Sequence, residues 1–332
     1  MVDPITPRRA KELYLEDRTD LSDTSKQNHG YRVERFVEWC EENGIDNLNE
    51  MTGRRIHEFK VWRAEEVNNV TLQNQLGTIR QFLSFCERID AVSTGLSKKV
   101  ELPQLGMNED VSDTAITPEE AEAILDYLGK YEYATLRHVI FYLLWHTGIR
   151  TSTLRAFDIT DLHIGEGYIK AVNRESTGTP LKNRQRGERE INLGKDVIEV
   201  LNDWVHDLHP RVEDDSGRMA LICTSFGRAH ETTIRAHVYK ATRPCYYSNQ
   251  CPHDRKIEDC EAVMSPNASQ CPSSVSPHAI RKGSITYHRN KGWPVEAVSD
   301  RADVSREVLD KHYDKASNSE KRQRRTEFLD KL

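Results

Sequence analysis

The first third of the chain repeats its apolar side chains with a helical period. One such run extends over residues 31–40 and a second over residues 72–86, each with spacings of three and four residues. Strand-like alternation is scarce here, and Asn43-Gly44 and Thr52-Gly53 are typical of helix ends. We therefore expect residues 1–105 to form a bundle of about four or five short helices with its own core.

A short stretch without helical period separates this part from the rest of the chain. Residues 97–112 carry Pro103 and Gly106, which is typical of a linker between domains. At 332 residues, the chain is also long for one helical core. We therefore predict two domains, residues 1–105 and residues 106–332.

The second domain is predicted to be helical around a small sheet. Residues 136–147 are apolar nearly all round, which indicates a buried helix. Short strands are expected at residues 162–164, 168–172 and 190–193, the last one after a polar, basic loop. From residue 197 onward the pattern is helical, apart from a cysteine-rich segment. The predicted fold class is mainly α with a small three-stranded sheet.

This domain also carries scattered cations followed by one late tyrosine. In chain order these residues are Arg150, Lys182, His278, Arg281, Arg301 and Tyr313. A phenolate can attack a phosphodiester and form a covalent ester, while guanidinium groups neutralise the phosphate oxygens, so no metal is needed. The set therefore predicts an enzyme that cuts and rejoins DNA.

The segments around these residues resemble the catalytic boxes of the tyrosine recombinase, or phage integrase, family. Thr147-Gly148-Ile149-Arg150 resembles the first box, and His278-Ala279-Ile280-Arg281 resembles the His-x-x-Arg box. Residues 298–305 resemble the Leu-Gly-His-Ser segment, and Lys311-His312-Tyr313-Asp314 matches the nucleophile position. The resemblance covers nearly the whole chain and implies a helical core-type DNA-binding domain followed by a catalytic domain of the DNA breaking-rejoining fold.

The resemblance also implies a role for each matched residue. Arg150 and Arg281 would hold the non-bridging oxygens of the scissile phosphate, which gains negative charge during in-line displacement. Tyr313 would be the nucleophile, giving a 3'-phosphotyrosine and a free 5'-hydroxyl without ATP or a catalytic metal. His278 and the arginines would assist it, because a phenol has a pKa of about 10 in water.

Two positions fit the family pattern less directly. Lys182 lies where the family has a hairpin lysine that protonates the leaving 5'-oxygen. Arg301 stands where a histidine or tryptophan is usual, and an arginine can hydrogen-bond a phosphate but cannot shuttle a proton. The alternatives are Lys170, Arg184 or Arg186 in place of Lys182, and His312 as a second partner of the phosphate.

Four of the seven cysteines crowd into one insertion. Cys245, Cys251, Cys260 and Cys271 lie within 27 residues, together with His253. Structural zinc takes four cysteines, or three cysteines and one histidine, so we predict zinc on the four cysteines with His253 as an alternative ligand. The other interpretation is a loop of reduced cysteines. The insertion is not part of the general family pattern, and with it the chain resembles an archaeal-like variant.

Charge and hydropathy limit which partners and which location the sequence predicts. The net charge of -6, from 47 basic and 53 acidic side chains, counts weakly against nucleic acid, although local cation placement decides phosphate affinity. The resemblance implies double-stranded DNA as the partner and a homo-oligomer on it, a tetramer in synapsis. No apolar stretch is long enough to span a bilayer, so we expect a soluble, cytoplasmic protein.

The favoured function is that of a site-specific recombinase or integrase. Two alternatives remain open. One is a type IB-like topoisomerase, which would act without a preferred sequence. The other is a zinc-containing, sequence-specific DNA-binding regulator that does not cleave.

Overall fold

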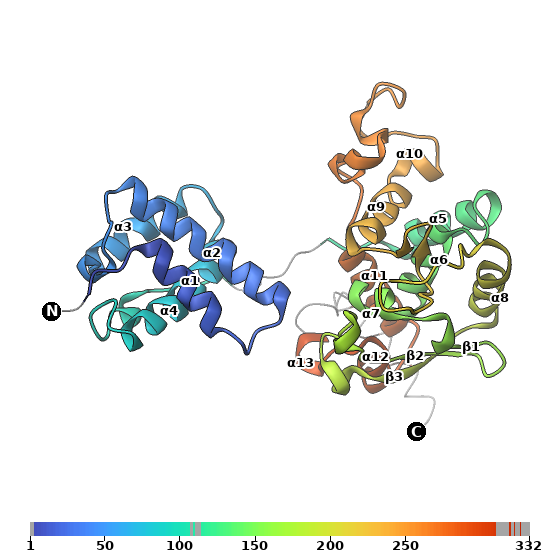
Figure 1. Ribbon diagram of the computed structural model, residues 1–332. Coiled ribbons are helices and arrows are strands. Elements are labelled where there is room, and N and C mark those ends of the chain that lie inside the picture. Colours follow the sequence, from blue (N-terminus) through green and yellow to red (C-terminus); the bar gives the residue numbers. More distant parts are fainter. Residues whose placement is uncertain are drawn as a thin grey trace. The chain divides into compact units, whose positions relative to one another are not determined.

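The computed structural model describes residues 3–106, 109, 114–309, 319, 322 and 326. The chain divides into two compact units, residues 1–111 and residues 112–332, and helices dominate both (Figure 1). The sequence placed the boundary after residue 105, within the same linker. The predicted fold class, mainly α with a small sheet, is confirmed. No helix among the described residues is long and apolar enough to cross a membrane.

The described part of the first unit is a bundle of four α-helices, as the apolar period predicted. They are α1 (Pro7–Asp17), α2 (Asp23–Glu42), α3 (Gly53–Ala64) and α4 (Asn69–Arg88). Phe36 from α2 and Phe59 from α3 are fully buried, and their rings meet edge to face with centroids 5.1 Å apart. Asn43 caps the end of α2 as expected. The interpretation of Thr52-Gly53 as a helix end was wrong, because the Thr52 side chain accepts a hydrogen bond from Arg55 N and begins α3.

The second unit is built around one buried helix. Its helices are α5 (Pro118–Tyr131), α6 (Leu136–Thr147), α7 (Thr151–Ala156), α8 (Lys195–Asp203), α9 (Glu231–Ala241), α10 (Pro244–Tyr247), α11 (Pro277–Asn290), α12 (Val295–Ala302) and α13 (Arg306–Val308). Helix α6 is buried nearly all round, as its composition predicted, and packs against α5, α8, α9 and α11.

A three-stranded antiparallel sheet lies beside these helices. Its strands are β1 (Leu162–His163), β2 (Tyr168–Ala171) and β3 (Arg189–Asn192), in the order β1-β2-β3. Ile169 and Ile191 face each other across the β2-β3 pair, and both are buried. The prediction of an all-helical region after residue 197 was wrong in one place, because β4 (Cys223–Thr224) and β5 (Gly227–Arg228) form a second small sheet. Alternation cannot reveal strands of two residues.

Helix α11 approaches the chain that precedes α5 so closely that only a glycine fits. A Cβ atom on Gly283 would lie 2.3 Å from the carbonyl oxygen of Ile116. We therefore expect Gly283→Ala to destabilise the second unit by about 1–3 kcal/mol, because backbone must move. Gly129→Ala, also in a helix but with nothing within 4 Å of its Cβ, is the control and should stabilise by about 0.5–1 kcal/mol. Urea unfolding of both variants measures this, and equal effects would refute the close contact.

Candidate active site

Arg150 lies at a turn that is fixed from two sides. Helix α6 ends at Thr147, and Gly148 follows in the left-handed conformation with φ of 63°. The turn packs on α11, because a Cβ on Gly148 would lie only 3.2 Å from Ser284 Oγ. Arg150 then occupies the N-cap position of α7, and its Nη1 donates a hydrogen bond to Asp303 Oδ2 at 2.5 Å. The left-handed turn at Gly148 therefore ends α6 and positions Arg150 at the start of α7.

Arg281 is the most deeply buried cation of the predicted set. Its side chain on α11 is 1% exposed. Its Nη1 donates to the carbonyl oxygens of Gly148 and Ala302, at 2.7 Å each. One guanidinium thus joins the turn before Arg150 to the end of α12. His278 lies one turn earlier on α11, on an exposed part of the helix.

The Arg301 guanidinium donates hydrogen bonds to two backbone carbonyl groups. Nη1 donates to Asn192 O at 2.7 Å, and Nη2 donates to His146 O at 2.9 Å. The guanidinium carbon also lies 5.4 Å from the centre of the Trp293 ring, and burial lowers the Arg301 pKa. In this structure Arg301 therefore ties α12 to β3 and α6, and a contact with phosphate stays a prediction.

Arg189 joins the same cluster, although the sequence singled it out only as part of a basic loop. Its Nε donates to Arg301 O at 2.9 Å and its Nη1 to Gly187 O at 2.7 Å. Burial lowers the pKa of Arg189 to about 10; the Asp303 carboxylate opposes this shift, and the charges of Arg281 and Arg150 add to it. Arg189 thus lies close enough to Arg150 and Arg281 for their charges to act on it, and these three residues are called the arginine cluster below.

A carboxylate is seated against this cluster. Asp303 caps α12 in the left-handed conformation, with φ of 53°, and its side chain is only 13% exposed. Its Oδ2 accepts from Arg150, and its Oδ1 accepts from Asn183 Nδ2 at 2.7 Å. Nothing in the sequence indicated this contact, because it joins residues more than 100 positions apart. The Asp303 carboxylate is therefore shared between Arg150 of the cluster and Asn183.

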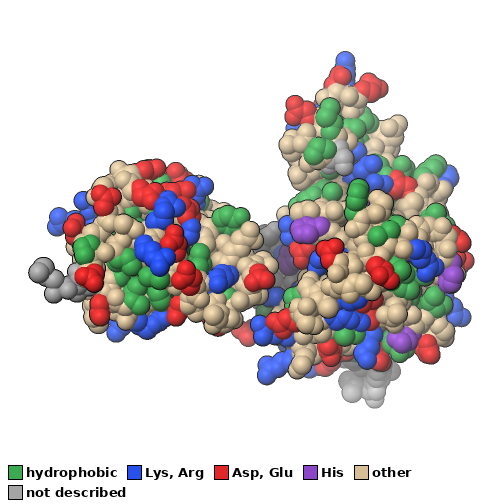
Figure 2. Space-filling view, in the orientation of Figure 1, with side chains coloured by type: hydrophobic (Ala, Val, Ile, Leu, Met, Phe, Trp, Pro, Cys, Tyr) green, Lys and Arg blue, Asp and Glu red, His purple; other side chains and the backbone are tan. Residues whose placement is uncertain are grey.

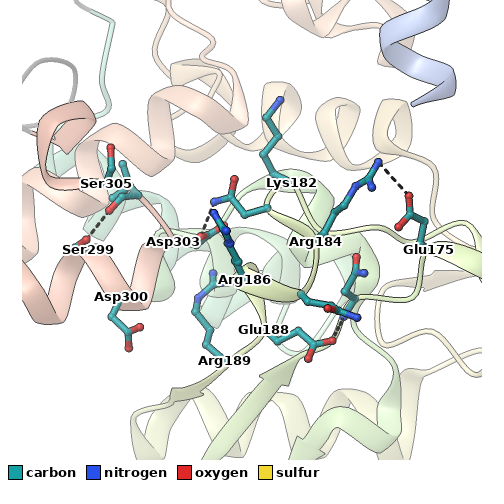
Figure 3. Close-up of a pocket in the computed structure, with 14 residues that line it drawn as sticks. Glu175, Lys182, Arg184, Arg186, Glu188, Arg189, Ser299, Asp300, Asp303 and Ser305 are labelled. Atoms are coloured by element: carbon teal, nitrogen blue, oxygen red, sulfur yellow. Dashed lines mark hydrogen bonds and ion pairs between the residues drawn. The ribbon is translucent and has the colours of Figure 1, made fainter. Parts of the chain in front are cut away.

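A cavity of about 1010 Å³ opens next to Asp303. The loop between β2 and β3 forms one wall and the end of α12 with the start of α13 forms the other (Figure 3). Lys182 lines it with an exposed side chain, and Figure 3 shows the ammonium pointing away from its loop. Arg184 and Arg186, the proposed substitutes for Lys182, line the same wall. Three of the predicted cations of this loop therefore face one space.

The nucleophile position cannot be placed against this site. Tyr313 and the neighbouring His312 lie outside the described residues. Among the predicted residues that are described, Arg150 and Arg281 converge directly, Arg301 braces them through backbone, and Lys182 faces the adjoining cavity. Sequence reasoning missed Asp303 and the particular importance of Arg189.

The cysteine insertion projects from the second unit around α10 (Figure 1). All four of its cysteines are free thiols. Burial raises the pKa of Cys245, the charge of Arg243 opposes this, and the charges of the other three thiols raise it further, so each of the three lies near enough to act on Cys245. His253 contacts Ser273 Oγ through Nε2 at 2.9 Å. Within the described parts of the chain, however, no group of three or more His, Cys, Asp or Glu side chains is arranged so that it could hold a metal ion.

The surface charge is mixed. On the face shown in Figure 2, Lys and Arg side chains are interspersed with Asp and Glu on both units. This pattern agrees with the balance of 47 basic and 53 acidic residues. No single-sign patch therefore stands out on this face of either unit.

A family model and several curated proteins are similar to this chain. The family described as phage integrase, N-terminal SAM-like domain, matches residues 12–89. A putative tyrosine recombinase, TTE1313, of Caldanaerobacter subterraneus subsp. tengcongensis is 19% identical over 58% of this chain and 61% of its own length. Tyrosine recombinase XerC of Natranaerobius thermophilus is 20% identical over 76% of this chain and 74% of its own length. This chain thus spans less than two thirds of the first relative.

Two solved structures share the fold over nearly all of this chain. The Tn1549 transposon integrase in complex with a circular intermediate DNA superposes with a TM-score of 0.67 at 16% identity, covering 98% of this chain and 99% of that one. A lambda integrase dimer bound to a COC' core site gives a TM-score of 0.61 at 12% identity, covering 97% and 78%. At such identities the likeness establishes the fold.

Proposed function

The chain belongs to the tyrosine recombinase family, which includes the phage integrases, and from this premise we propose that it is a site-specific DNA recombinase or integrase. It cuts duplex DNA through a 3'-phosphotyrosine intermediate and rejoins it. The observation that carries this proposal is the arginine cluster with a carboxylate seated against it. Such a cluster is a preformed site for an oxyanion, and a phosphodiester supplies one.

The chemistry follows from the groups around that anion. The Tyr313 oxygen attacks phosphorus in line, a bond to the tyrosine forms, and the bond from phosphorus to the 5'-oxygen breaks. Arg150 and Arg281 stabilise the charge added to the non-bridging oxygens, and the fixed position of Arg281 means little reorganisation is needed. Lys182 gives its proton to the leaving 5'-oxygen, while exposed His278 assists removal of the phenolic proton. The ester retains the energy needed for religation, so neither ATP nor a catalytic metal is required.

Several partners belong to the same proposal. The substrate is double-stranded DNA, held chiefly through phosphate contacts, and the active assembly is a homo-oligomer that reaches four copies in synapsis. The protein acts in the cytoplasm. The nearest rival is a DNA-binding regulator that does not cleave, which is favoured by one observation. Arg301 replaces the family's histidine or tryptophan and has its guanidinium bonded to two carbonyl groups.

The test of this function is a covalent adduct. DNA that the protein binds is recovered from genomic fragments and sequenced, and a duplex with a nick near the bound site is prepared, so that the released strand diffuses away. A recombinase accumulates as a protein linked to DNA on a denaturing gel. A type IB-like topoisomerase would do so on unrelated duplexes as well, whereas a regulator would bind its site and never form the adduct.

We further propose that the insertion binds a structural zinc ion through Cys245, Cys251, Cys260 and Cys271, with His253 as the alternative ligand. The neighbouring thiols support this, as does the shortage of buried apolar side chains in the segment, where Ala262 and Ala268 are the main ones. Such a loop gains order from a metal more readily than from a core. Because the described ligand side chains are not yet arranged for a metal ion, binding of zinc would bring the four sulfur atoms closer together.

About one zinc ion per chain is therefore expected by elemental analysis of the purified protein. Cys260→Ser should lower that content sharply and expose the insertion to proteolysis, because three thiolates hold zinc less well than four. Cys86→Ser removes a thiol from the core of the first unit and is the control, with unchanged zinc. A wild-type protein that is purified without zinc and takes up none would contradict the proposal.

A further inference from the structure

Arg189 is held as rigidly as the arginines that the family resemblance identified. It is the first residue of β3, and the β2-β3 pairing fixes its backbone. Two of its nitrogens are bonded to carbonyl groups, Nε to Arg301 O and Nη1 to Gly187 O. The guanidinium plane is therefore set by main-chain atoms from both ends of the site. A side chain positioned in this way is ready for an anion without further ordering.

The third nitrogen of Arg189 is the atom of interest. Nη2 is buried, and no described residue accepts a hydrogen bond from it. A buried N–H of a charged group without an acceptor is costly, so native proteins seldom retain one unless a ligand completes it. A purely structural role of Arg189 accounts for the hydrogen bonds of Nε and Nη1 but not for the burial of Nη2 without an acceptor among the described residues.

The surroundings identify the missing acceptor as an anion. Arg189 lines the cavity beside Asp303, and its side chain points toward that carboxylate (Figure 3). Burial is the main cause that lowers the pKa of Arg189, and the charges of Arg281 and Arg150 lower it further. Asp303 is paired with Arg150, and one carboxylate neutralises only one of the three guanidiniums, so the cluster retains positive charge. A carboxylate and a phosphodiester each present two oxygens that share a negative charge, and both are acceptors for arginine N–H groups.

We propose that Arg189 is a third phosphate-binding arginine of the site, and that the Asp303 carboxylate stands in the phosphate's place until DNA displaces it. This rests on the proposed function, since it assigns a further residue to the same reaction. On displacement, Asp303 releases Arg150 and Asn183, and the phosphate oxygens accept from Arg150, Arg281 and Nη2 of Arg189. The site then holds three guanidiniums around the charge that develops at phosphorus.

The decisive experiment compares two substrates with two proteins. Adduct formation is timed on the nicked duplex with an ordinary phosphate at the cut position, and on the same duplex with a neutral methylphosphonate there. The methylphosphonate lacks the charged oxygen that an arginine neutralises. Arg189→Gln is expected to slow the reaction on phosphate by about 10²-fold. On methylphosphonate the variant and the wild type should react at nearly equal rates.

The controls separate the possible failures. Arg235→Gln alters an exposed arginine on α9 and should leave both rates unchanged. Equal slowing on both substrates would mean that Arg189 acts only as a brace, and no slowing on either would dismiss it altogether; both outcomes overturn the inference. If the wild type itself forms no adduct, the proposed function fails instead. Should Arg189→Gln unfold, Arg189→Met removes the charge while keeping an apolar stem, and it is compared on the same two substrates with the same expected difference.

Discussion

Arg281→Ala is expected to reduce the rate of covalent adduct formation on the order of 10³-fold. The guanidinium is 1% exposed and bonded to Gly148 O and Ala302 O, so water cannot replace its charge at the phosphate. Arg281→Lys should be nearly as slow. A lysine keeps the charge, but its single nitrogen cannot both hold the two carbonyl groups, as Arg281 Nη1 does, and offer further nitrogens to the phosphate.

The same substitution should also weaken the fold. Two buried carbonyl oxygens lose their donor, and each such loss costs about 1–3 kcal/mol. The matched control is Arg235→Ala, which removes an exposed arginine paired with Glu231 on the same helix. Adduct formation and thermal unfolding are measured on both variants at a temperature where Arg281→Ala is still folded. A folded Arg281→Ala protein that cleaves at the wild-type rate would show that the arginine cluster is not the phosphate site.

Tyr313→Phe is expected to remove adduct formation entirely while DNA binding remains close to the wild-type level. The substitution deletes one hydroxyl, the proposed nucleophile, and a phenyl ring cannot form a phosphate ester. Binding persists because phosphate contacts by the two units supply most of the affinity. A filter-binding titration and a denaturing gel on the same nicked duplex measure the two quantities.

The control for this change is a tyrosine that is exposed on the second unit. Tyr131, on α5, is 64% exposed, and Tyr131→Phe should leave both binding and adduct formation unchanged. A Tyr313→Phe protein that still forms the adduct would require a different nucleophile. Loss of DNA binding in step with the adduct would point to a structural role for the ring.

The parts of the fold that could be predicted from the sequence are those set by neighbouring residues. Helix α6 was predicted because its apolar composition leaves no polar face, and the α2 and α4 helices were predicted from three- and four-residue spacing. Thr52-Gly53 was read the wrong way because a glycine next to a threonine can close one helix or open the next. Capping by the Thr52 side chain, which depends on geometry, decided the outcome.

The site divides in the same manner. Arg150 and Arg281 could be predicted because short motifs surround them and a glycine-dependent turn places one of them. Asp303 could not, because its contact with Arg150 depends on how α12 packs against α6 and β3, which no local pattern encodes. Arg189 was one basic residue among several in a loop, and what distinguishes it from exposed Arg186 are its bonds to Arg301 O and Gly187 O and a buried Nη2 without an acceptor among the described residues. Long-range packing thus selects which cations of a basic sequence form the site.

The central claim is that a tyrosine oxygen attacks a phosphate held by arginines from distant parts of the chain. Peptide mapping of the trapped adduct by mass spectrometry tests it most directly. After nuclease and protease digestion, the account predicts one nucleotide-modified peptide, with the phosphate linked to Tyr313 through a 3'-phosphodiester end. Attachment to another residue, or attachment that persists unchanged in a folded Arg150→Ala protein, would contradict it.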